Sequence, residues 1–197
     1  MTILLFDEQV PWAGNPYIKI GSYVFLAIMA LLVLIFLLER FLLFRSAVRT
    51  SRKFAPRAAA ALKEKRWDEA LDIARKQPKS HLARVVCVGL ETRKRLLDKL
   101  PNELIVKHME EGMEREIIKV NYEYVQGLAR FEWIGGVAPF VGILGGSQQS
   151  FAAGTAIAVP ALWFASFMRA KTLRFEAEMK HAASEVVTFV EEQMHSV

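Results

Sequence analysis

The sequence predicts an all-α integral membrane protein with three transmembrane helices and long cytoplasmic helical extensions. Of its 197 residues, 53% are hydrophobic and 24% are charged, and the two classes are segregated along the chain. Residues 20–38 carry no charge, whereas 21 of the 26 basic residues lie between Arg40 and Arg130. This segregation excludes a simple soluble globule and a disordered chain. The single cysteine, Cys87, excludes an intrachain disulfide scaffold.

Residues 1–19 are predicted to form a periplasmic N-terminal segment, and residues 20–45 the first transmembrane helix. About twenty apolar residues at ~1.5 Å each cross the ~30 Å hydrocarbon core. A cleaved signal peptide is the alternative, but no basic region precedes the apolar run and no small-residue cleavage site follows it. Only Lys19 precedes the span, while several basic residues follow it closely, so the N-terminus is predicted to be outside. The following basic residues are Arg45, Arg49, Arg52, Lys53 and Arg57.

Residues 46–130 are predicted to form a cytoplasmic helical segment. Small and apolar residues recur at helical spacing in residues 58–65 and 67–76, which predicts a pair of helices. Pro78 ends this pair, and Ser80 has the position of an N-cap for the next helix.

A long amphipathic helix is predicted from Leu104 to the membrane, and residues 169–197 repeat the arrangement in reverse as a cytoplasmic C-terminal helix. No glycine–proline break precedes Arg130, so the first of these helices is expected to continue straight into the second span. The stripes predict packing of the two helices against each other or against neighbouring subunits, and we interpret them as an oligomer interface. The stripe residues are Ile105, Met109, Met113, Ile117, Val120, Tyr124 and Leu128, and Thr172, Phe175, Met179, Ala182, Val186, Phe189 and Val190.

Residues 131–168 are predicted to form the second and third transmembrane helices, joined by a short polar turn at residues 147–150. Arg130 and Arg169 flank this region, which predicts a helical hairpin that enters from the cytoplasm and returns to it. The C-terminus is therefore expected to be cytoplasmic. The uncharged part of the first arm gives about 21 Å of helix, which is short for a span, so a re-entrant hairpin is an alternative.

The sequence does not predict an enzyme, a metal site or a cofactor. Cys87 lies on an apolar helix face and is predicted to be an inert buried thiol, and the four histidines lack metal-ligand spacing. The basic character, with a pI of 9.4, is explained by topology and by contact with membrane lipid. Nucleic-acid binding is not predicted, because no aromatic interleaving or recognition module accompanies the charges. The alternative that includes nucleic-acid binding is a soluble DNA-binding helical protein with one membrane anchor.

Small residues and single prolines dominate both arms of the predicted hairpin. Small side chains let helices approach closely within a membrane. No ionisable residue lies within the apolar segments, although such residues usually mark a proton route. Composition alone therefore favours a tightly packed two-helix anchor, and a pore lining is the alternative.

The order of one span, a basic helical segment and two small-residue spans resembles the ExbB/TolQ branch of the ExbB/TolQ/MotA proton-channel family. The resemblance covers essentially the whole chain and is specific in WDEALDIARKQPKSHLARVVCVGLETR, GGVAPFVGILGG and AAGTAIAVPALWFASFMRAKTLRFEAEM. It implies a multi-pass protein of the bacterial inner membrane, assembled as a homopentamer around two copies of an ExbD/TolR-like single-span partner. It also implies a stator function, in which the proton-motive force drives cell-envelope work such as outer-membrane transport. Under this resemblance, we expect an inner helix ring whose residues pack and shape a pore rather than transfer protons. These residues are Pro139, Gly142, Gly145, Gly146, Thr155 and Pro160.

The chain departs from the family pattern at the tip of the hairpin. The resemblance implies two threonines, an acidic residue and a periplasmic loop there, and hence a longer chain. Here Gly146 and Phe151 occupy the expected threonine positions, and the intervening loop is absent. The alternative function is therefore a non-conducting oligomeric membrane scaffold of the same fold.

Overall fold

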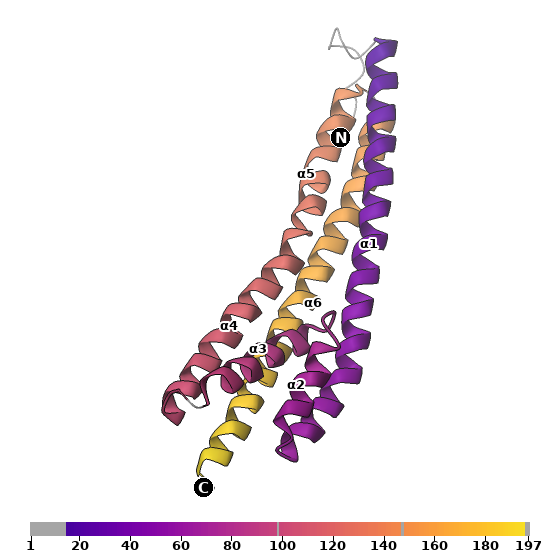
Figure 1. The fold of residues 1–197 in the computed structure, drawn as a ribbon. Coiled ribbons are helices and arrows are strands. Elements are labelled where there is room, and N and C mark those ends of the chain that lie inside the picture. Colours follow the sequence, from indigo (N-terminus) through magenta and orange to yellow (C-terminus); the bar gives the residue numbers. More distant parts are fainter. Residues whose placement is uncertain (1–14, 98, 147, 196–197) are drawn as a thin grey trace, which may run out of the picture. The chain divides into compact units, whose positions relative to one another are not determined.

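In a computed structural model, the structure describes residues 15–97, 99–146 and 148–195, and helices account for most of them (Figure 1). Within these ranges there is no strand, which confirms the all-α prediction. Most of the predicted periplasmic segment and Ser147 of the predicted turn lie outside the described residues. The helices are α1 (Pro16–Lys63), α2 (Trp67–Arg75), α3 (His81–Leu96), α4 (Asn102–Gln126), α5 (Ala129–Leu144) and α6 (Gln148–His195).

Three helical stretches are long and apolar enough to cross a membrane, in agreement with the predicted number. They are Pro16–Lys63, Asn102–Leu144 and Gln148–Gln193. The chain divides into two compact units that we describe separately. Unit 1 comprises Met1–Phe41 and Val125–Ala170, and unit 2 comprises Leu42–Tyr124 and Lys171–Val197.

The core of unit 1 consists of one buried stripe from each of its three helices. The stripes follow the three- and four-residue spacing of a helix face. Edge-to-face and tilted ring contacts connect them, since the Phe131 ring lies 6.2 Å from that of Phe36 and 5.1 Å from that of Phe164. The stripes are Leu26, Met29 and Val33 in α1, Phe131, Ile134 and Ala138 in α5, and Ala158, Ala161, Ala165 and Met168 in α6.

The outward faces of the same helices are also apolar. Large side chains on all three helices of unit 1 are exposed, including Leu34, Trp133 and Trp163, each more than 60% exposed. An exposed apolar surface of this extent is typical of contact with lipid or with other protein chains. Unit 1 therefore has the surface composition of a membrane-spanning bundle.

The predicted continuity of the long helix into the second span holds only in part, because a two-residue turn interrupts the stretch Asn102–Leu144. The structure has a turn at Gly127 and Leu128 between α4 and α5, where the Leu128 N–H donates to the Val125 carbonyl at 2.8 Å. Glycine is a weak helix former, and a Cβ at Gly127 would overlap the guanidinium of Arg40. A larger side chain at this position would therefore require the Arg40 side chain to move.

Unit 2 is a helical bundle whose first helix is the second half of α1. Residues 58–63 belong to α1 itself, so the predicted helical pair is the end of α1 followed by α2. The chain reverses at Lys65, which has a left-handed φ of 59°. Ser80 caps α3 as predicted, because its side chain accepts a hydrogen bond from the Ala83 N–H at 3.2 Å.

The apolar stripes of α4 and of the second part of α6 lie in the core of unit 2. Ile105, Met109 and Val120 are buried against the same cluster as Met179 and Val186. The two helices therefore share one core, as one of the predicted alternatives requires. The interpretation of these stripes as an oligomer interface is wrong, because the chain buries them itself.

Candidate functional site

The two arms of the predicted hairpin, α5 and the first part of α6, approach each other with backbone in direct contact. A Cβ at Gly142 would lie 2.6 Å from the carbonyl oxygen of Ser150, and a Cβ at Gly154 would overlap the carbonyl oxygen of Ala138. Only glycine fits at such distances without displacing a backbone. Gly142 and Gly154 therefore set how closely the two helices pack.

The tip of the hairpin is equally close. A Cβ at Gly145 would lie 2.5 Å from Ser150 Oγ, and Gly146 has a left-handed φ of 64°. The Gly146 N–H donates to the Ile143 carbonyl at 2.9 Å, which closes the end of α5. Left-handed glycine is the common C-terminal cap of a helix. The glycines at 145 and 146 therefore end α5 and admit Ser150 beside it.

The predicted inner-ring residues differ in burial and form three groups in the structure. Gly142, Gly145 and Gly146 are buried within unit 1, whereas Pro160 is exposed. Pro139 and Thr155 are half-buried. The assignment of the whole set to a pore stays a prediction, since the exposed members would need a second chain around them.

Thr155 is the one hydroxyl among the predicted inner-ring residues. Its Oγ1 donates to the carbonyl of Phe151 in its own helix at 3.0 Å. Such a bond within the helix satisfies the hydroxyl where water is absent. The geometry therefore agrees with packing, not with a proton relay through this side chain.

The charged residues of the two hairpin arms lie at one end of the arms. An ion pair joins Arg169 of α6 to Glu132 of α5, and Arg130 lies over the Phe36 ring with 5.4 Å from its guanidinium carbon to the ring centroid. Beyond these residues the arms are uncharged as far as the tip. The hairpin thus has a polar base and an apolar body, which matches a membrane boundary at the base.

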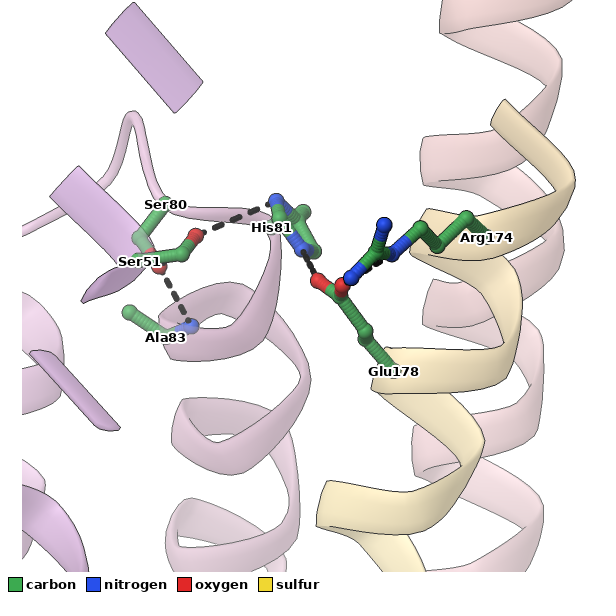
Figure 2. A network of polar contacts seen from close by, with 6 residues as sticks. All are labelled: Ser51, Ser80, His81, Ala83, Arg174 and Glu178. Atoms are coloured by element: carbon green, nitrogen blue, oxygen red, sulfur yellow. Dashed lines mark hydrogen bonds and ion pairs between the residues drawn. The ribbon is translucent and has the colours of Figure 1, made fainter. Parts of the chain in front are cut away.

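A second polar constellation lies in unit 2, around a buried histidine that sequence reasoning missed (Figure 2). His81 is only 1% exposed, and its ring stacks on Phe175 at a centroid distance of 4.3 Å. Ser51 Oγ lies 3.1 Å from Nδ1, and Glu178 Oε2 lies 3.3 Å from Nε2. Ser51 also contacts Ser80 Oγ at 2.8 Å. The network therefore ties α1, the start of α3 and α6 together.

With the His81 ring neutral and Glu178 ionised, each hydrogen bond in this network has one direction. An ionised carboxylate only accepts, so His81 Nε2 carries a proton and donates to Glu178. The neutral ring then accepts at Nδ1 from the Ser51 hydroxyl. Ser80 donates in turn to Ser51 and accepts from the Ala83 N–H at 3.2 Å. With Arg174 Nε donating to Glu178 at 3.2 Å, each donor has one acceptor.

The network connects helices of unit 2, and its serine is too buried to act as a catalytic nucleophile. Its serine, histidine and carboxylate follow the order of a hydrolase triad, but Ser51 is only 4% exposed and lies between two partners. Burial lowers the pKa of His81 below its usual value, and the neighbouring Glu178 opposes this shift only in part. A neutral, fully hydrogen-bonded imidazole is the form that a buried position favours.

Unit 2 contains two further ionisable side chains of interest, Cys87 and Arg84. Cys87 is half-buried and not buried as predicted. Partial burial and the Glu91 carboxylate raise the pKa of its thiol, which is the direction of lower reactivity. Arg84 joins α3 to α4 through ion pairs with Glu116 at 2.7 Å and Glu123 at 2.6 Å. Among the described residues, no group of three or more histidine, cysteine or acidic side chains is arranged to hold a metal ion.

No protein-family model matches the chain, and no curated protein sequence matches it.

Proposed function

We propose that the chain is an ExbB/TolQ-like stator subunit of the bacterial inner membrane, coupling the proton-motive force to cell-envelope work such as outer-membrane transport. The observation that carries the proposal is the α5–α6 hairpin, whose glycines pack the two arms backbone to backbone while its outer faces remain apolar. In this proposal the exposed apolar faces contact lipid and neighbouring copies of the chain, most simply in a pentamer. An ExbD/TolR-like single-span protein is the proposed partner.

A non-conducting scaffold of the same fold is the second candidate, and a specific observation favours it. The hairpin arms contain no ionisable residue from Trp133 to Met168, and the Thr155 hydroxyl bonds to its own helix. A proton route would then have to use water or groups supplied by the partner. The function of this candidate is to hold the assembly together without passing protons.

Proton flux distinguishes the two candidates. We expect proteoliposomes that contain the chain with its co-purified single-span partner to acidify when a proton gradient is applied, above the level of protein-free vesicles. Vesicles with the chain alone are the control, and native mass spectrometry of the same sample gives the number of copies. Flux equal to the protein-free background in a correctly assembled sample would favour the scaffold.

The proposed topology gives a separate prediction. With Cys87 replaced by serine, we expect a Tyr17→Cys variant in intact cells to react with a membrane-impermeant thiol reagent. A Lys76→Cys variant should react only after the inner membrane is permeabilised. Both positions are exposed in the structure, so burial does not limit either reaction. Equal labelling of the two variants in intact cells contradicts the predicted orientation.

A further inference from the structure

Unit 1 contains an apolar groove between α1 and α5 that the proposed function does not use. Its volume is about 500 Å³, and all but one of its lining residues are apolar or aromatic. Phe25 and Met29 line one part on α1, and Trp133 and Ile134 line the α5 side. The exception is Arg130, so the groove combines a hydrocarbon surface with a single cation.

The Arg130 charge has no carboxylate opposite it. Over the ranges that the structure describes, its side chain contacts the Phe36 ring and forms no ion pair. Arg169, in contrast, is paired with Glu132. A guanidinium without a counter-ion, beside an apolar groove, is complementary to a phosphate group, which it can bind through two parallel hydrogen bonds.

The length of the groove matches one leaflet of a bilayer. Phe25 and Phe36 both line the groove. They are eleven positions apart in α1, which corresponds to about 16 Å along the helix axis. Half of the ~30 Å hydrocarbon core is ~15 Å. Arg130 lies beside Phe36, and Trp133, which is 65% exposed, follows within one turn. Arginine and tryptophan at this level are typical of the cytoplasmic membrane interface.

The shape of the groove favours an acyl chain over a helix. Its α1 wall extends over residues 25–36, whereas its α5 wall extends only over residues 129–134. A helix with side chains has a diameter of about 10–12 Å and is rigid. A single hydrocarbon chain is narrower and flexible, so it can follow the long α1 wall and enter the short part that has two walls.

We propose that this groove binds one acyl chain of an anionic glycerophospholipid from the cytoplasmic leaflet, with the lipid phosphate against Arg130. The inference rests on the membrane location in the proposed function, but not on proton conduction. Packing of the chain against the aromatic side chains supplies van der Waals contacts, since no transfer from water drives association inside a bilayer. The guanidinium supplies the preference for a negatively charged headgroup.

Native mass spectrometry of the full chain, extracted from vesicles of equal phosphatidylglycerol and phosphatidylethanolamine, tests the proposal. We expect the wild type to retain phosphatidylglycerol at least five-fold over phosphatidylethanolamine. Arg130→Gln should reduce this ratio to about one, and Ala129→Trp, which fills the groove, should remove retention of both lipids. Arg45→Gln is the matched control, because it removes an equal charge on an exposed part of α1 outside the groove.

Two results would overturn the proposal. One is an equal loss of phosphatidylglycerol in Arg130→Gln and Arg45→Gln, which would reflect net charge alone. The other is an efficient disulfide between two copies of a Leu32→Cys chain that lacks Cys87, since Leu32 lines the groove and a second copy would then occupy it. Extraction from membranes and proton flux are read on the same samples. Failure of lipid retention in a chain that inserts and assembles therefore contradicts this inference without contradicting the proposed function.

Discussion

Replacing Gly154 with valine should lower the stability of the hairpin by about 3 kcal/mol, or the Tm by ~6–12 °C in detergent. The first added carbon would overlap the Ala138 carbonyl oxygen and would lie 3.3 Å from Gly142 Cα. Both obstacles belong to the backbone of α5, so no rotamer change relieves them. The two arms must separate, and thermal unfolding followed by tryptophan fluorescence measures the loss, because Trp133 and Trp163 lie on the two arms.

Gly136→Val is the matched control. Gly136 lies in α5, and a Cβ built there meets nothing within 4 Å. The same exchange of glycine for valine carries the same change of intrinsic helix propensity in both variants. Gly136→Val should therefore keep the Tm of the wild type. A drop as large as that of Gly154→Val would mean that close contact between α5 and α6 is not the cause.

Helical periodicity was sufficient to predict most of the fold from the sequence. The three long apolar stretches and the Ser80 cap are local signals, and both are found in the structure. The two-residue turn at Gly127 and Leu128 interrupts a stretch that is helical on both sides, so helical periodicity could not reveal it. The burial of the Met113 and Met179 stripes in one core depends on tertiary packing, because a stripe looks the same whether it faces its own chain or another.

The composition of the hairpin predicted close packing but not which residues meet. Gly154 was outside the predicted set although it makes the closest approach, and Pro160 was inside it although it is exposed. The spacing of the small residues did contain a signal. On each arm, three buried small residues follow one another at intervals of four and then three positions, which places them on one helix face. The two stripes are Ala138, Gly142 and Gly145, and Gly154, Ala158 and Ala161.

The His81 network had no sequence signal at all. Its partners lie 30 residues before it in Ser51 and 97 residues after it in Glu178. Only the folding of unit 2 brings α1, α3 and α6 to one point. Buried polar networks of this kind depend on complete hydrogen bonding, which no local pattern encodes.

Unit 2 should lose stability as the pH falls from about 7.5 to 5, with His81 contributing a slope of up to ~1.4 kcal/mol per pH unit. Burial lowers the folded pKa of His81, so below the unfolded value of about 6.5 the unfolded chain binds more protons. Stability is therefore full above that pH and decreases as the pH falls towards the folded pKa. Hydrogen exchange of α3 amides in the full chain, corrected for the intrinsic rate at each pH, measures the free energy of opening.

The hydrogen-bond directions explain why a proton on Nδ1 is costly. A charged His81 ring would donate to Ser51, Ser51 would donate to Ser80, and the Ser80 hydroxyl would lose the acceptor that it has in the neutral network. A buried donor without an acceptor costs about 1–3 kcal/mol. His81→Gln should lower stability at pH 7.5 and remove this part of the slope. His181→Gln should keep the slope, because His181 is 77% exposed in its side chain; an unchanged slope in His81→Gln would instead assign the pH dependence to another group.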